Sequence, residues 1–365
     1  MLRACALIGA GLLTLGCDVY HPEAFFDAGV DAGPRLDAGF DAGRPDAGRP
    51  DGGPPDAGPA CVLEHVPSRP LEADSGDQII SFALRDVILD QRMTVWSDIG
   101  YDHDGECTEM VGQGTCLSRG GLPQLDGPGG VDNVGGRQVL SLLAERYPGV
   151  QDNARAEQMA GRHIVFVHVS GWNGTDEDPR VTAWFAQGLD AAPEGGAIGD
   201  PLRWDGHDQF ELSSADFEGG DPLRPLIADD LGYVADRRLV LNVPDGRPIL
   251  LPWDDDRALV LRLTDAFLTG TISADATRLD DVTITGRWAV IDIQAVFTQL
   301  GLCPGTSERA NADVLLAQFP DIRSDPATDG LGAMCDAYSI AVGFTGYRGI
   351  FASIGMAPSP VDICP

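Results

Sequence analysis

Lysine is absent from this chain of 365 residues, so its 25 Lys-or-Arg residues are all arginines. Without lysine the protein cannot form the Schiff base of a pyridoxal-type enzyme. It also lacks the lysine that phosphate-binding loops use in nucleoside triphosphatases. The chain contains no His-Glu-x-x-His motif, no Gly-x-Ser-x-Gly elbow and no Cys-x2-Cys pair, which are short motifs of zinc proteases, serine hydrolases and zinc-binding modules. None of these standard catalytic or zinc-binding motifs is therefore present.

Positive charge is scarce along the whole sequence. The formal net charge is −31, because 56 Asp and Glu residues outnumber the 25 arginines. A surface of this sign repels nucleic acids and anionic lipid head groups, so we expect no nucleic-acid partner. Two interpretations stay open: the surface attracts cations and basic partners, or it keeps an exported protein soluble.

The apolar stretch at the N-terminus is too short to cross a bilayer. It runs from Ala4 to Leu15, about a dozen residues, with Arg3 as the preceding charge. A membrane-spanning helix needs about 20 such residues, whereas the apolar region of a signal peptide is about as long as the stretch from Ala4 to Leu15. We therefore predict a signal peptide over residues 1–16.

The four residues Thr14, Leu15, Gly16 and Cys17 resemble a bacterial lipobox. Gly16 and Cys17 match that motif, while Thr14 and Leu15 depart from its usual leucine and small residue. The resemblance implies cleavage before Cys17 after a diacylglycerol has been attached to its sulfur. Two or three acyl chains anchor a protein stably in a membrane. The alternative is an ordinary cleaved signal peptide with Cys17 as a free thiol.

A repetitive acidic segment follows the cysteine, over residues 17–60. Its Asp-Ala-Gly units begin at Asp27, Asp31, Asp37, Asp41, Asp46 and Asp56. Small, charged and proline-rich sequence buries too little apolar surface to offset its ordering entropy, so we predict a disordered linker. The lipobox, this repeat and the absence of lysine together resemble surface lipoproteins of myxobacteria. That resemblance covers the first 60 residues and implies a place in the cell envelope, at the outer membrane, on the cell surface or facing the periplasm.

Six cysteines remain after the signal peptide and the anchor: Cys61, Cys107, Cys116, Cys303, Cys335 and Cys364. An even number in an exported protein predicts three disulfides. We predict the pairs Cys107–Cys116, Cys303–Cys335 and Cys61–Cys364, which would close a short loop, hold a helical insertion and join the two ends of the domain.

Residues 61–365 are predicted to form a β-rich globular domain. Alternating apolar residues indicate strands over 79–89, 164–169, 181–185, 238–243, 257–263, 266–272, 282–288 and 338–345. The alternation changes parity at Thr264 and Asp265, which indicates a bulge. Helical spacing follows Asp132 and Asn133, follows Asp292, and is weaker from Ala310 to Phe319. The pattern is typical of a mainly β (α+β) body, a sandwich or jelly roll with two or three helical insertions.

The segment from 98 to 133 has the densest group of carboxylates. Calcium takes six to eight oxygen ligands from closely spaced carboxylates on a loop where glycine allows a sharp turn. The candidate ligands are Asp98, Asp102, Asp104, Glu106, Asp126, Asp132 and Asn133. The alternative is an acidic surface loop in which Asp132 caps a helix.

Tryptophans beside polar residues form a second candidate site. The residues are Trp172, Asn173, Trp204, Asp205 and Trp253. At strand ends such rings can stack on a sugar while polar neighbours bind its hydroxyl groups. The alternative is that the rings close the ends of the core.

These observations favour a lipid-anchored envelope protein whose β domain binds a ligand without catalysis. The ligand would be calcium, a glycan in a calcium-dependent manner, or an envelope protein. Two other classes stay open. One is an extracellular hydrolase that acts through carboxylates, and the other is a structural subunit of an envelope complex.

Overall fold

The computed structural model describes residues 64–71, 76–108, 114–119, 124–254, 257–330, 332–356 and 363–364. The predicted signal peptide, Cys17, the linker and Cys61 lie outside the described residues. Within the described ranges, no helix is both long and apolar enough to cross a membrane.

The strands are β1 (Gln78–Arg85), β2 (Ile164–Trp172), β3 (Asp178–Ala192), β4 (Gln209–Ser213), β5 (Ile227–Ala235), β6 (Arg238–Val243), β7 (Pro248–Asp254), β8 (Arg257–Ile272), β9 (Arg278–Ala289), β10 (Ala337–Arg348) and β11 (Ile350–Gly355). The α-helices are α1 (Ser141–Arg146), α2 (Val150–Met159), α3 (Val290–Gln299) and α4 (Ser307–Leu316). A π-helical turn, Gly136–Leu140, leads into α1.

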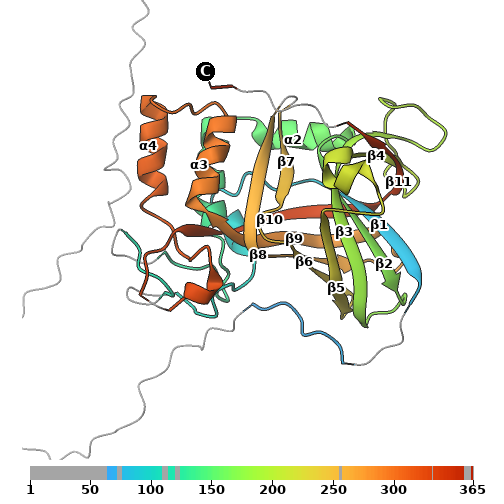
Figure 1. Cartoon of the computed structure of the whole chain (residues 1–365), viewed down its shortest axis with the longest axis horizontal. Helices are drawn as coiled ribbons and strands as arrows, with labels where there is room; N and C mark the ends of the chain where they lie inside the picture. The colour runs from blue at the N-terminus through green and yellow to red at the C-terminus, as the bar shows by residue number, and fades with distance from the viewer. Residues whose placement is uncertain are drawn as a thin grey trace, which may run out of the picture. The chain divides into compact units, whose positions relative to one another are not determined.

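Eight antiparallel strands close into a barrel in the order β1, β10, β9, β8, β6, β5, β3 and β2 (Figure 1). The mainly β class is confirmed, but the predicted sandwich or jelly roll is wrong. Closure depends on β3, which pairs with β2 along one edge and with β5 along the other. Because β3 has 15 residues, its C-terminal part also pairs with β4. Periodicity within single strands does not reveal this double pairing.

The barrel interior is filled by apolar side chains from neighbouring strands. One row across the sheet contains Leu241, Leu268, Ile284 and Val342, and another contains Phe82, Val167, Phe185 and Ile227. All eight belong to the main hydrophobic core. Leu279 fits between Gly270 and Gly346, where a Cβ atom would come within 2.7–2.8 Å of it. The interior is therefore a packed core, as expected for a barrel of this strand number.

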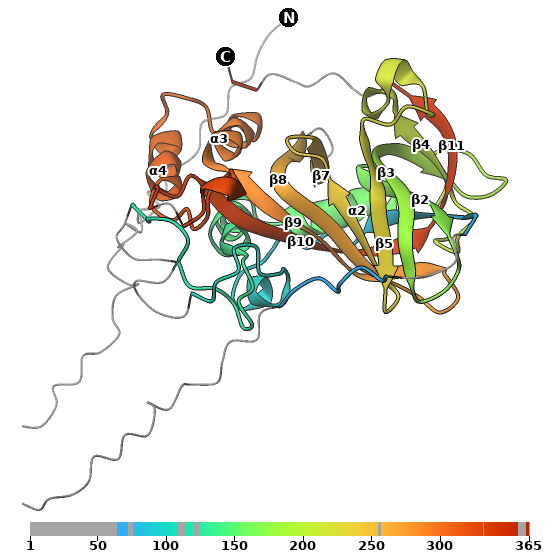
Figure 2. The same cartoon turned by 60° about the horizontal axis from the view of Figure 1, so that its bottom comes forward.

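Additional elements cover the barrel from outside. The main core continues into α1, α3 and β7, with Leu143, Phe297 and Leu251 each at most 1% exposed. The β4 and β11 strands add a parallel pair beyond β3 and enclose a smaller core around Phe166 and Phe210. Figure 2 shows β4 and β11 at one side of the domain and α3 and α4 at the other.

The predicted bulge is confirmed. Asp265 has a φ of 50°, and the register between β8 and β9 shifts between Thr264 and Phe267. The three predicted helices correspond to α1 with its π-helical turn, α3 and α4. The helix α2 and the strands β4, β5, β7 and β11 were not predicted.

The cysteines pair differently from the prediction. Cys116 bonds to Cys335, and Cys303 bonds to Cys364. The three predicted pairs are therefore wrong. Cys116 is not free to pair with Cys107, Cys303 and Cys335 bond to other cysteines rather than to each other, and Cys364 is not free to pair with Cys61. Cys107 is also disulfide-bonded. All five described cysteines are thus oxidised, which agrees with the prediction of a disulfide-stapled domain.

Candidate functional site

The candidate site lies on a loop that packs against the outside of β8 and β9. The Tyr101 hydroxyl lies 2.9 Å from Thr269 Oγ1, and His103 Nε2 lies 2.7 Å from Thr285 Oγ1. Both threonines are fully buried and alternate with the core residues Leu268 and Ile284. These contacts fix the loop segment around residue 102 on the barrel wall.

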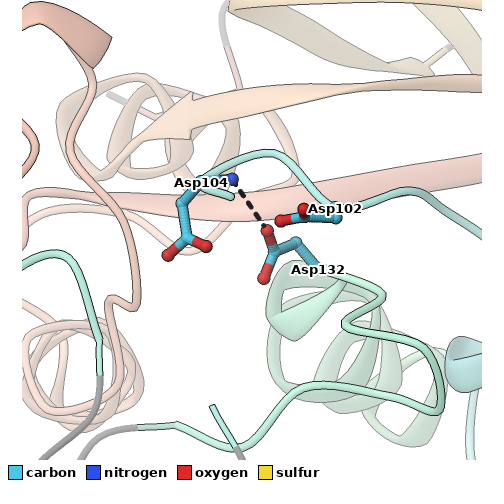
Figure 3. Close-up of side chains that lie close together, drawn as sticks. All are labelled: Asp102, Asp104 and Asp132. Carbon is cyan, nitrogen blue, oxygen red and sulfur yellow. Dashed lines mark hydrogen bonds between the residues drawn. The ribbon is translucent and has the colours of Figure 1, made fainter. Parts of the chain in front are cut away.

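Three carboxylates converge at this position: Asp102, Asp104 and Asp132. One oxygen from each lies within 4.8 Å of the others. Figure 3 shows the three side chains gathered beside one another. The backbone N–H groups of His103 and Asp104 donate to Asp132 Oδ2 over 2.7 and 3.3 Å. The N–H of Gly105 donates to Asp102 Oδ1 over 2.8 Å. The turn at 102–105 therefore places Asp102 and Asp104 beside Asp132, which is distant from them in sequence.

Asp102 has one oxygen without a hydrogen bond. Its side chain is fully buried, and Oδ2 has no hydrogen-bond partner. It forms an ion-pair contact with His65, whose Nδ1 lies 3.6 Å away and whose side chain is 59% exposed. A buried carboxylate oxygen normally has a hydrogen bond, an ion pair or a metal ion. Apart from the contact with His65, this buried oxygen has no partner among the described residues, which favours a further cationic ligand.

A cavity of about 10 Å³ adjoins two of the three carboxylates, Asp104 and Asp132, and its volume is about the space that one water molecule requires. Its acidic lining residues are Asp104, Asp126, Asp132 and Asp321. The disulfide Cys116–Cys335 forms part of the wall. Asp321 was not predicted; it precedes β10 and accepts hydrogen bonds from the backbone and hydroxyl groups of Ser339.

Burial raises the pKa of four of these carboxyl groups. Desolvation is the main cause for each, and repulsion between neighbouring carboxylates adds to it. The pKa of Asp126 rises to about 7 and that of Asp321 to about 8, while the pKa values of Asp104 and Asp132 are raised as well. These four residues and Asp102 form what we call the aspartate cluster. At neutral pH the cluster therefore holds protons, and a cation could replace them.

Among the described residues, the ion pair with the cluster comes from the exposed His65, whose Nδ1 lies 3.6 Å from Asp102 Oδ2. Burial, with repulsion from Arg287, lowers the pKa of His103 to about 3, so this imidazole is neutral. Arg287 is 2% exposed, and its guanidinium pairs with Asp265 and Asp329. Among the described residues, no arginine forms an ion pair with the aspartates of the cluster. The cluster therefore has the negative charge that a metal ion would neutralise.

Of the other predicted ligands, Asp126 lines the cavity, and three more lie away from both the cavity and the group of three carboxylates. Asp98 and Glu106 are exposed. Asn133 is fully buried, but its amide donates to Gln91, Trp96 and Ile99, and its Oδ1 accepts from the N–H groups of residues 136 and 341. Asn133 therefore caps the helical turn and holds the loop against β10.

The structure does not gather the tryptophans of the second candidate site. Trp172 and Trp253 are 7% and 2% exposed and belong to the main core. Trp204 packs in the smaller core against Phe210 and Tyr347. The rings thus share no open face on which a sugar could stack.

The polar residues of that second candidate site stabilise local turns. Asn173 Oδ1 accepts from the N–H and hydroxyl of Thr175. Asp205 Oδ1 accepts from the N–H of His207. These contacts explain the polar residues beside Trp172 and Trp204 without a ligand.

Comparison with known proteins gave no match: no family model, no curated protein and no solved structure matches this chain. The geometry and charge of the aspartate cluster are the features of this chain that point to a function.

Proposed function

We propose that the β-barrel domain binds a calcium ion through Asp102, Asp104 and Asp132, and that it does so in the cell envelope as part of a lipid-anchored protein. The observation that carries this proposal is the buried Asp102 Oδ2, which has no hydrogen bond and lies beside two further carboxylates. A cation there would satisfy that oxygen and reduce the repulsion within the cluster.

The donor atoms favour calcium over other metals. The three residues offer only oxygen, and no histidine or cysteine belongs to the group. Zinc and copper sites commonly use imidazole or thiolate ligands. Magnesium usually retains several waters, for which a cavity of about 10 Å³ is small. Calcium accepts an irregular set of carboxylates and backbone carbonyl groups, such as a buried loop can supply.

Bound calcium would act mainly on the loop that covers the outside of the barrel. Asp102 and Asp104 belong to one segment, and Asp132 lies shortly before the helical turn that leads into α1. An ion that joins them would fix both segments against β9 and β10. We propose that this makes the loop rigid, and that the domain in this form binds a partner in the envelope.

Calcium should raise the melting temperature of the purified protein. An ion at 100 times its dissociation constant stabilises the folded state by about 2.7 kcal/mol, which is a shift of several degrees for a domain of this size. Asp132→Asn should abolish the shift, because it removes a ligand that is 2% exposed. Differential scanning calorimetry in calcium and in chelator measures this.

Glu106→Gln is the matched control for that experiment. It removes one negative charge from the same loop, but the Glu106 side chain is exposed, and the backbone N–H that it donates to Asp104 is kept in the variant. It should retain the calcium shift. An unchanged wild-type melting temperature in calcium would contradict the proposal, and equal loss of the shift in both variants would contradict the assignment of the ligands.

The lipid anchor is tested separately. Cells that express the protein with an alkyne fatty acid in the medium should label the wild-type chain and a Cys5→Ser variant. The Cys17→Ser variant should remain unlabelled, because the thioether to diacylglycerol needs that sulfur. Cys5 is the control because it lies within the predicted signal peptide. Label on Cys17→Ser, or none on the wild type, would contradict the anchor.

A further inference from the structure

The disulfide Cys116–Cys335 forms part of the cavity at the aspartate cluster. Both cysteines line this cavity together with Asp104, Asp126 and Asp321. The bond joins residues that are 219 positions apart. It therefore holds the short segment 114–119 against the segment that precedes β10.

That short segment contacts the cation site directly. The Thr115 hydroxyl donates to Asp104 Oδ2 over 2.8 Å. Thr115 is adjacent to Cys116, so the disulfide positions this hydroxyl. The hydrogen bond leaves Asp104 Oδ1 to accept the N–H of Glu106, and the two bonds together orient the carboxylate.

Apart from the disulfide, backbone hydrogen bonds hold the segment in place. The N–H of Gly330 donates to Thr115 O over 2.7 Å, the N–H of Leu117 to Ala333 O over 2.8 Å, and the N–H of Cys335 to Leu117 O over 3.0 Å. Leu117 is 55% exposed, so these bonds compete with water. Each contributes about 0.5–1.5 kcal/mol. The covalent bond is therefore the strongest single tie between the segment and the body of the domain.

We propose that the oxidised Cys116–Cys335 disulfide and calcium binding at the aspartate cluster stabilise each other, so that reduction of this disulfide weakens calcium binding. The inference rests on the proposed calcium site. In the reductive step, a small dithiol donates two electrons and two protons to the S–S bond. The step forms two cysteine thiols, and the dithiol becomes its own disulfide. Because binding linkage is reciprocal, calcium should make this disulfide harder to reduce.

The first test compares two variants of the full mature chain. Cys116→Ser/Cys335→Ser removes the disulfide at the site. Cys303→Ser/Cys364→Ser is the matched control, since it removes a disulfide that does not line the cavity. Calcium titration by calorimetry should give a dissociation constant at least about fivefold weaker for the first variant, at the lower end of typical coupling. The control should bind within about twofold of the wild type.

The outcomes separate the two proposals. If the wild type does not bind calcium, the proposed function fails. If the wild type binds and both variants bind equally well, or are weakened equally, the linkage is overturned while the calcium site stands.

A second measurement on the wild-type protein covers the case in which the first variant does not fold. The protein is equilibrated in a dithiothreitol redox buffer with calcium or with chelator, and the thiols are labelled and located by mass spectrometry. Calcium should lower the reduced fraction of Cys116–Cys335 and leave that of Cys303–Cys364 unchanged. An equal reduced fraction of Cys116–Cys335 under both conditions, in a protein that binds calcium, overturns the proposal.

Discussion

Replacing Arg287 by methionine should lower the free energy of unfolding by about 3–5 kcal/mol, the usual cost of removing one partner of a buried ion pair. The guanidinium is 2% exposed and bonds to Asp265 Oδ2 at 3.1 Å and to Asp329 Oδ2 at 2.6 Å. It also donates to the carbonyl oxygens of His103 and Arg323. Without it, Asp329 would be a largely buried carboxylate with no counter-charge, close to the aspartate cluster.

Arg278→Met is the control for this prediction, because Arg278 lies on the same strand, β9. Its side chain is 52% exposed and pairs with Asp280 over 3.1 Å. Exposed pairs of this kind contribute about 0–1 kcal/mol, so the variant should be nearly as stable as the wild type. Urea denaturation followed by circular dichroism gives both values. A loss below about 1 kcal/mol for Arg287→Met would show that Arg287 does not hold the loop and the barrel together.

In chelator, the domain should lose stability as the pH rises from about 4 to about 8. The pKa of the Asp321 carboxyl is raised by burial from 3.8 to about 8, so the folded state holds this proton more tightly than the unfolded state. The stabilisation is complete below the unfolded pKa and is lost as the pH rises through the folded pKa. Because one pKa unit corresponds to about 1.4 kcal/mol, the loss is on the order of several kcal/mol. Thermal melts across this pH range measure it.

Asp321→Asn isolates that effect. The amide resembles the protonated carboxyl in shape but does not ionise, and it can still accept the N–H of Ser339. The variant should show a much smaller decline with pH than the wild type. Calcium should also reduce the decline in the wild type, since the ion replaces protons in the cluster. A wild-type melting temperature that stays constant or rises between pH 4 and 8 in chelator would contradict the role of Asp321.

Strand positions could be predicted where alternation is local. The parity change at Thr264 and Asp265 correctly indicated the bulge in β8. The start of a helix after Asp132 and Asn133 could be predicted for the same reason, and the structure gives the capping role to Asn133 rather than Asp132, because the Asn133 side chain accepts an N–H three residues later. The helix α2 and the strand β7 were missed. β7 contains Pro248 and Pro252, which disfavour a strand in a sequence-based prediction, and within the described part of the chain it pairs with β8 alone.

The candidate site was predicted in part. Asp102, Asp104 and Asp132 lie in one acidic stretch, and the structure brings these three together. No sequence pattern indicates that Asp321 belongs to the site, because it lies far along the chain from the acidic stretch. It joins the other carboxylates only when β10 has packed beside β9. The disulfide partners were mispredicted for the same reason: Cys116 meets Cys335 only once both segments lie against the barrel.

The amino-acid sequence by itself determined the chemistry that this protein can offer: no lysine, a large excess of carboxylates, an even set of cysteines for disulfides and alternating strands. It also carries the predictions of export and of a lipid anchor at Cys17. The tertiary structure alone decided that the sheet closes into a barrel, which cysteines pair, and which carboxylates become buried together. These outcomes depend on contacts between residues far apart in the chain, and local periodicity contains no information about them.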